Sequence, residues 1–121
     1  MGKYEIRKTP TGYKFDLKAC NGETIATSEV YETEAACRKG VESVRKNGEK
    51  AKLTDLTEDG RPVSNPKYEL FQDKAGAFRF RLKARNGGVI AVSEAYSTKA
   101  ACLNGIESVR KNAPDSQIET E

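Results

Sequence analysis

KACNGETIATSEVYETEAACRKGVESVRKN, residues 18–47, decides the fold, because residues 83–112 repeat it as KARNGGVIAVSEAYSTKAACLNGIESVRKN. The two stretches align without a gap at a constant offset of 65 residues, and about two-thirds of their positions are identical. Upstream, KYEI at residues 3–6 matches KYEL at residues 67–70 at an offset of 64. The repeat covers nearly the whole chain, which indicates an internal duplication.

Each repeat is predicted to hold three strands followed by a helix. In the first repeat, apolar and polar residues alternate over 4–7 and again over 13–19, which is typical of half-buried strands. Asn21-Gly22 predicts a type I′ turn with positive φ at both central residues, and a short strand follows over 24–28. The apolar stripe of residues 33–47 predicts a helix with Thr33 as its N-cap. The second repeat predicts the same elements, with Asn86-Gly87 as the turn and a helix over 98–112.

One more strand is predicted after each helix, over 52–57 and over 116–120. Gly40 and Gly105 stand in the middle of the helices, where glycine is unfavourable, so we expect a close helix–sheet or helix–helix approach there. Three strands and one helix form a thin core for an independent unit. We therefore expect a single domain, 1–121, in which repeat 1 (1–57), a linker (58–66) and repeat 2 (67–121) share one sheet, with both helices on one face.

The patterns NG-x-x-IA-x-SE-x-Y and AAC-x-x-G-[VI]-ESVRKN each occur twice, and KYELFQDKAGAFRFRLKA precedes the second copy. In these patterns the chain resembles, over essentially its full length, the YegP-like family of small bacterial and archaeal proteins of unknown function. The resemblance implies an α+β fold of two tandem β(3)-α-β repeats, with a single antiparallel sheet and exchanged last strands. Residues 53–56 would pair with the second repeat, and the segment at Ile118 with the first. It also implies single-repeat relatives that dimerise, and it supplies no catalytic residues.

Composition excludes several chemistries. The chain has 121 residues, a net charge of +3, and no His or Trp. The absence of His removes the commonest general base and all imidazole metal sites. Three cysteines without a CxxC spacing are predicted to be free thiols in a reducing compartment, so we expect a cytoplasmic protein without a metal or cofactor. No apolar run approaches the ~20 residues that cross a bilayer, and residues 1–10 do not read as a secretory signal.

Three sets of side chains are candidates for a role beyond the core. Cys37 and Cys102 lie on the apolar helix stripes and are expected to be buried, whereas Cys20 is expected to be exposed. The triplets Ser28/Glu29/Tyr31 and Ser93/Glu94/Tyr96 recur where strand meets helix. They are either a two-fold pair of polar pockets or residues that shape the turn while the tyrosine packs on the core edge. The helix pairs Glu42/Arg45 and Glu107/Arg110 are expected to lie on a solvated face.

The most suggestive pattern is basic. Residues 67–112 hold nine Lys and Arg against four Asp and Glu. The polar positions of the long second-repeat strand are Arg79, Arg81, Lys83 and Arg85, predicted to face away from the helices with an exposed Phe71 beside them. Such a surface can bind single-stranded nucleic acid through phosphates and one stacked base. The alternative is that these charges keep an open sheet from pairing with other sheets.

These observations favour a non-enzymatic protein with an interaction or structural role, and weak single-stranded nucleic-acid binding is the alternative function. We expect a monomer with pseudo-two-fold symmetry that does not act at a membrane. Its partner, either a nucleic acid or a protein, is not identified by the sequence, and neither are its pathway and any further oligomerisation.

Overall fold

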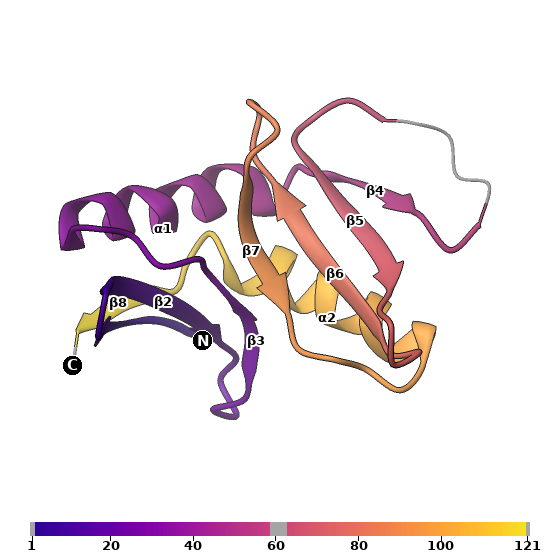
Figure 1. Cartoon of the computed structure of the whole chain (residues 1–121), viewed down its shortest axis with the longest axis horizontal. Coiled ribbons are helices and arrows are strands. Elements are labelled where there is room, and N and C mark those ends of the chain that lie inside the picture. The colour runs from indigo at the N-terminus through magenta and orange to yellow at the C-terminus, as the bar shows by residue number, and fades with distance from the viewer. Residues whose placement is uncertain (1, 59–62, 121) are drawn as a thin grey trace.

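The computed structural model describes residues 2–58 and 63–120, and all of its strands belong to one sheet. The elements in chain order are β1 (Lys3–Thr9), β2 (Gly12–Lys18), β3 (Thr24–Thr27), α1 (Glu34–Gly48), β4 (Lys52–Asp55), β5 (Lys67–Gln72), β6 (Phe78–Lys83), β7 (Val89–Ser93), α2 (Lys99–Asn112) and β8 (Gln117–Thr120). The strand order across the sheet is β4-β5-β6-β7-β3-β2-β1-β8, so the two repeats meet where β7 pairs with β3 (Figure 1).

The sheet is mixed, and the expectation of a single antiparallel sheet was wrong at both edges. β4 runs parallel to β5, with Leu53 opposite Tyr68. β8 runs parallel to β1, with Ile118 opposite Tyr4. Two consecutive strands that run parallel cannot be joined by a tight turn and require a longer connection. Part of the expected linker, residues 59–62, lies outside the described residues.

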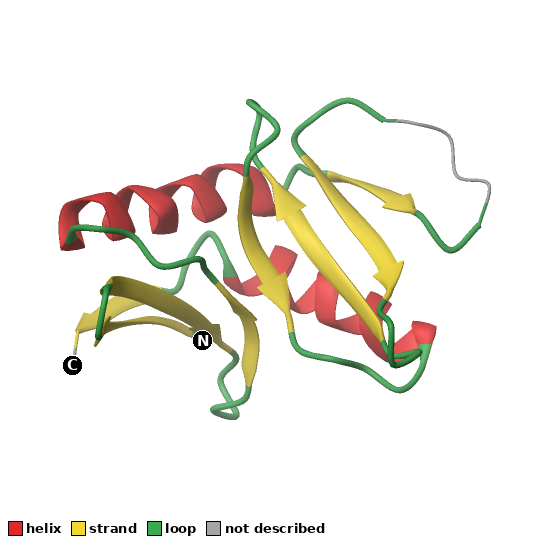
Figure 2. Ribbon diagram, in the orientation of Figure 1, coloured by secondary structure: helices red, strands yellow, loops and turns green. Residues whose placement is uncertain are grey.

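Each repeat therefore completes the edge of the other repeat's half of the sheet. The helices are shared in the same way: α1 contacts β2 and β7, and α2 contacts β6 and β3. In the view of Figure 2, α2 passes behind the strands of the second repeat, and one end of α1 reaches β7. The buried side chains that the strands and helices contribute to the core include Tyr4, Phe15, Leu17, Val41, Val44, Tyr68, Phe80, Leu82, Ile106 and Val109.

The helix starts agree with the sequence prediction, and the hairpin turns do not. Thr33 and Thr98 are the N-caps, and each side-chain oxygen accepts from a backbone N–H three residues later. In the first hairpin, Gly22 has a φ of 86°, but the described residues include no residue other than glycine with positive φ. The Gly22 N–H donates to the Ala19 carbonyl oxygen at 2.9 Å. The turn thus follows right-handed geometry and places only its last residue in the left-handed region, so the type I′ prediction was wrong.

Gly105 and Gly40 allow the close helix–sheet approach that their mid-helix positions predicted. A Cβ atom at Gly105 would lie 2.5 Å from Tyr96 Oη and 3.0 Å from Phe80 Cε2. Gly40 lies against Tyr31 and Phe15 in the equivalent way. Both tyrosines also form a single bridge to the sheet, opposite Tyr13 and Phe78. The helix backbone therefore packs directly on an aromatic ring that the sheet holds in place.

Two buried tyrosines join each repeat to the other. Tyr4 Oη donates to the Ala113 carbonyl oxygen at 2.8 Å, and Tyr68 Oη donates to the Gly48 carbonyl oxygen at 2.5 Å. Both carbonyls belong to residues at a helix C-terminus, where the last carbonyls have no partner within the helix. Each tyrosine from a first strand thus satisfies the end of the helix of the opposite repeat.

Two arginines complete this link, which we call the repeat clasp (Tyr4, Arg45, Tyr68 and Arg110). Arg45 lies over the Tyr4 ring at 5.3 Å from its centroid and donates to the Ser116 carbonyl oxygen of the other repeat at 2.6 Å. Arg110 lies over the Tyr68 ring at the same distance and donates to the Ala51 carbonyl oxygen at 2.8 Å. The expected purely solvated role was therefore wrong for both arginines. In each arginine, Nη1 donates to the glutamate of the same helix and Nη2 donates to the carbonyl oxygen near the exchanged strand.

Replacing Gly105 by alanine is expected to destabilise the protein by about 1–3 kcal/mol, the cost typical of overpacking. Alanine is the better helix former by about 1 kcal/mol, so the sign of the effect reports the contact with Tyr96 and Phe80. Urea unfolding followed by circular dichroism measures the change. Asn104→Ala, on the exposed face of the same turn, is the control and is expected to be neutral or slightly stabilising. A stabilised Gly105→Ala variant would contradict the close approach.

Tyr68→Phe is expected to lower the free energy of unfolding by about 1–3 kcal/mol, because it leaves the Gly48 carbonyl without its partner in the core. The same unfolding measurement applies. Tyr13→Phe removes a hydroxyl that makes no side-chain hydrogen bond within the described residues, and is expected to have little effect. Equal losses for the two variants would show that the clasp hydrogen bond contributes nothing specific.

Candidate functional site

The basic strand face predicted from the sequence is largely neutralised by its own neighbours. Glu69 on β5 is only 6% exposed and lies among three cations. Arg81 Nε is 2.6 Å from Glu69 Oε1, and Lys83 Nζ is 3.3 Å from the same oxygen. Lys67 Nζ lies 3.5 Å from Glu69 Oε2. One buried carboxylate thus serves as the common partner of three basic side chains.

The rest of that face is also occupied. Arg79 Nε lies 2.9 Å from Asp73 Oδ2. Phe71, predicted to be exposed, is half-buried, and the Arg81 guanidinium covers its ring at 4.6 Å from the centroid. The cross-strand register is the reason, since Arg79 stands directly opposite Phe71 and Arg81 opposite Glu69. A nucleic-acid base that stacked on Phe71 would have to displace Arg81.

Glu69 remains ionised because of these partners. Burial alone would raise the pKa of this carboxyl, but hydrogen bonds from Arg81 and Lys83 outweigh burial and hold the pKa below its usual value. The carboxylate therefore contributes stability at neutral pH. Glu69 therefore has a structural role in the sheet, and its charge neutralises the basic side chains around it.

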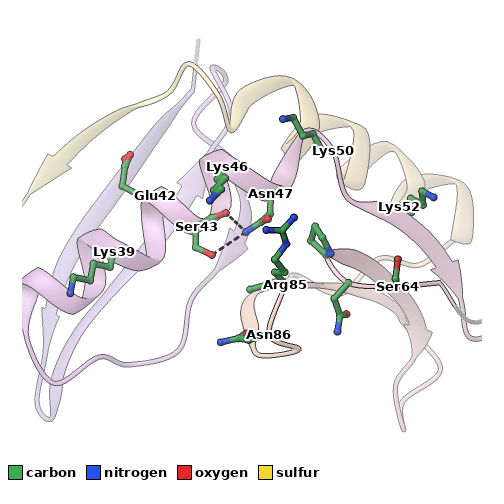
Figure 3. A pocket seen from close by; sticks show the side chains of 13 residues that line it. Lys39, Glu42, Ser43, Lys46, Asn47, Lys50, Lys52, Ser64, Arg85 and Asn86 are labelled. Carbon is green, nitrogen blue, oxygen red and sulfur yellow. Dashed lines mark hydrogen bonds between the residues drawn. The ribbon is translucent and has the colours of Figure 1, made fainter.

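Arg85 lies apart from the other three basic residues of the predicted face. It stands in the turn between β6 and β7, and it lines a groove of about 600 Å³ beside the C-terminal half of α1. We call this the basic groove and define it by its charged lining residues, which are Lys39, Glu42, Lys46, Lys50, Lys52 and Arg85. Figure 3 shows Arg85 extending from the hairpin toward α1, close to Asn47 and Lys46, with Lys39 and Lys52 at opposite ends.

The five cations of the basic groove have no acidic partner in the part of the chain that the structure describes. None of them forms an ion pair there. Glu42, the one acidic side chain in the lining, is bonded to Arg45, with Oε1 2.7 Å from Nη1. All five cations are exposed. The outer face of β6 differs in this respect, because its basic side chains Arg79, Arg81 and Lys83 each form an ion pair with Asp73 or Glu69.

The pseudo-symmetric position holds a second groove of about 450 Å³ with a different charge. It lies beside α2 and the turn between β2 and β3, and its charged lining residues are Lys111 and Asp115. Where the basic groove has Lys50, the second groove has Asp115, and where it has Arg85, the second has Cys20. Asn104 and Gln117 stand at the positions equivalent to Lys39 and Lys52. The two grooves occupy equivalent places in the two repeats, and they differ in volume and in charge.

The sequence did not single out the four lysines, because the comparison of the repeats considered the positions at which they are identical. Lys39 and Lys46 lie on the exposed side of α1, and Lys50 and Lys52 lie where the chain leaves that helix. They come together with Arg85 only because α1 packs across the other repeat's hairpin. The positions at which the repeats differ in charge were the available signal.

The strand-to-helix serines have structural partners. Ser28 Oγ accepts from the Phe15 N–H at 2.9 Å and donates to the Glu29 carbonyl oxygen at 2.8 Å. Ser93 makes the same two bonds with Phe80 and Glu94. Each hydroxyl therefore replaces a missing ladder bond where the strand ends. The turn-shaping prediction therefore holds for the two serines, Tyr31 and Tyr96 are half-buried at the core edge, and the Glu29 and Glu94 side chains are exposed.

The cysteines lie where the sequence predicted. Cys37 and Cys102 are fully buried, and Cys20 is exposed in the second groove. Burial raises the pKa of Cys102 to about 11, so at neutral pH this thiol is protonated and a poor nucleophile. Within residues 2–58 and 63–120, no three acidic or thiol side chains are grouped as metal ligands would be. Over the same residues, neither helix has the length and apolar character that crossing a bilayer requires.

The fold and the groove define a class: a duplicated α+β domain whose halves exchange their last strands and differ in surface charge. The sequence profile described as "Domain of unknown function (DUF1508)" matches residues 11–55 and again residues 73–119. The chain belongs to this family, and the matched segments fall one in each repeat.

Relatives occur both with one repeat and with two. A UPF0339 protein of Treponema denticola is 67% identical over 52 residues, which are 43% of this chain and 90% of that protein. The UPF0339 protein YegP of Yersinia pestis is 41% identical over 113 residues, covering 93% of this chain and 88% of its own. The solution NMR structure of YegP from E. coli, a protein of unknown function, matches with a TM-score of 0.80 at 33% identity and covers 99% of this chain and 92% of its own. YegP is described as a protein of unknown function, as the resemblance to the YegP-like family implied.

Glu69→Gln is expected to lower the free energy of unfolding at pH 7 and to have a shrinking effect below about pH 4. The folded-state pKa of Glu69 lies below its unfolded value. Its contribution is therefore fully present above the unfolded pKa and is lost as the pH falls through the folded pKa. Urea unfolding of wild type and variant at pH 7, 5 and 3 measures the difference. A difference that stays constant with pH would contradict the role of the ionised carboxylate.

Proposed function

We propose that this protein is a non-catalytic binding protein that takes an anionic partner in its basic groove. The observation that carries the proposal is the convergence of Lys39, Lys46, Lys50, Lys52 and Arg85 without an acidic partner among the described residues. Five exposed cations in one groove repel one another and create a positive potential that attracts an anion. An anion seated among them removes that repulsion, and each contact adds a charge-assisted hydrogen bond.

The second groove supports a role in binding over a role in folding. It is formed by the equivalent helix and hairpin, α2 and the turn between β2 and β3, and its charged lining residues are one lysine and one aspartate. The scaffold therefore does not need the charges of the basic groove for its packing. Substitution at exposed, unpaired side chains is ordinarily close to neutral for stability, so these positions are free to serve a ligand.

The layout of the molecule completes the proposal. Two β(3)-α-β repeats with both helices on one face leave the ends of α1 and the β6–β7 hairpin open to solvent. The chain supplies both exchanged strands itself, which favours a monomer. Three free thiols favour a cytoplasmic protein. Single-stranded nucleic-acid binding across Arg79, Arg81 and Lys83 is the alternative, and it requires a phosphate to compete with Glu69 and Asp73 for these side chains.

Lys46→Glu combined with Arg85→Glu is expected to abolish retention on a heparin column at low salt, because it reverses two of the five charges. Lys111→Glu is the matched control, since Lys111 is the pseudo-symmetric equivalent of Lys46, and it is expected to elute near wild type. Circular dichroism checks that all variants are folded.

Arg79→Gln combined with Arg81→Gln separates the two surfaces. If binding uses the basic groove, this variant elutes with wild type. If it loses retention while the groove variant keeps it, the strand face is the binding surface and the groove proposal is wrong.

A further inference from the structure

The basic groove also indicates the chemistry of its ligand, an inference that rests on the proposed function. The cations form a row and not a cluster around one point. Lys39 and Lys46 are seven residues apart on α1, which separates them by about 10 Å along the helix axis. Lys50 and Lys52 continue beyond the helix end, at the far side of the groove in Figure 3. A single phosphate or sulfate ion reaches only part of this row.

The residue types indicate a flexible chain of charges. Four of the five cations are lysines, which are mobile point charges on long stems, and only Arg85 offers the planar fork that suits one fixed oxyanion. Lysines follow a linear polyanion whose groups need no single geometry. A ligand with one charge per short link matches this row better than an acidic peptide, whose carboxylates lie on separate side chains that must each be ordered.

The lining offers little to recognise anything except charge. Among the residues that the structure describes, it contains no aromatic side chain on which a base could stack. Two of its asparagines each have one amide atom engaged: Asn47 Nδ2 donates to the Ser43 carbonyl oxygen at 2.9 Å, and Asn86 Oδ1 accepts from the Gly88 N–H at 2.9 Å. Asn65 Oδ1 is buried without a partner among the described residues, and it is a single acceptor. The groove is therefore equipped for phosphates and poorly equipped for bases.

We propose that the basic groove binds a linear chain of phosphates laid along α1 from Lys39 to Lys52, with no contact that distinguishes one base from another. Two sources carry this chemistry, the backbone of a single-stranded nucleic acid and an inorganic polyphosphate. Both place successive negative charges on a flexible chain, and both lose affinity steeply with salt as counterions are released.

The test is an NMR titration of the isotopically labelled full chain at about 50 mM salt, where phosphate contacts are strong. The probes are inorganic phosphate, tripolyphosphate, a longer polyphosphate, oligothymidylate and oligoadenylate of about 12 nucleotides, and poly-glutamate of similar length. We expect shifts at the amides around Lys39–Lys52 and Arg85, with affinity rising at least tenfold from phosphate to the longer chains. If five cations each contact a phosphate, affinity for a single strand falls about 100-fold between 50 and 200 mM salt.

The outcomes separate this inference from the proposed function. Equal binding of polyphosphate and both oligonucleotides supports a phosphate-chain site, and binding of only one kind of chain supports it and identifies the source. Poly-glutamate binding as tightly in the same groove overturns the phosphate inference and leaves the anion groove standing. A tenfold preference between the two oligonucleotides overturns the claim that bases are not distinguished. No shift in the groove with any probe overturns both proposals.

A transplant gives a second test that does not depend on losing a function. Cys20→Arg, Asn104→Lys, Asp115→Lys and Gln117→Lys together give the second groove the charges of the first. All four positions are exposed: Cys20 lies in the turn between β2 and β3, Asn104 in α2, Asp115 between α2 and β8, and Gln117 is the first residue of β8. The expected stoichiometry for short polyphosphate rises from one to two per chain. A folded transplant that still binds one equivalent would show that charge alone does not make the site.

Discussion

Neither repeat of this protein can complete its own sheet, and the exchange of last strands is the constraint on which the rest of the structure depends. β1 and β5 each present an open edge that only the strand following the opposite helix covers. The repeat clasp stabilises that arrangement from inside the core. Each tyrosine hydroxyl donates to a carbonyl oxygen at the C-terminus of the other repeat's helix. Each arginine donates to a carbonyl oxygen in the segment that leads to the other repeat's exchanged strand. The clasp hydrogen bonds join residues 20 to 109 positions apart, and each of them links one repeat to the other, so the clasp ties the folding of the halves together.

The same exchange creates the grooves. α1 continues into a strand that lies beside the second repeat, so its C-terminal half must cross over the second repeat's hairpin. The symmetric crossing of α2 makes the second groove. Residues that let each helix pack closely on its own repeat, such as Gly40 against Tyr31 and Gly105 against Tyr96, are the same in both halves. Residues that only line the grooves have diverged, which is how one scaffold carries two different surface charges.

The β6 face and the basic groove show that several basic residues on one surface form a binding site only if acidic neighbours do not neutralise them. Alternation along one strand places Arg79, Arg81 and Lys83 on one face correctly, but it says nothing about the strand beside it. The register with β5 brings Glu69 under two of them, and the turn brings Asp73 to the third. Lys39 and Arg85, 46 residues apart, looked unrelated in the sequence and prove to share a groove without an acidic neighbour.

Features of short range could be read from the sequence: the duplication, the strands from their period of two, the helices with Thr33 and Thr98 as caps, the buried cysteines and the glycines at a close approach. Each depends on neighbours within one turn or one strand. The direction of the edge strands, the burial of Phe71, the reach of Arg45 and Arg110 and the basic groove required the assembled molecule. Their causes are contacts between different elements, from Arg81 over the Phe71 ring, ten residues away, to Arg45 on the Ser116 carbonyl, 71 residues away. One amino-acid sequence does not show which of its separate segments become neighbours, because that depends on how the two repeats pack against each other.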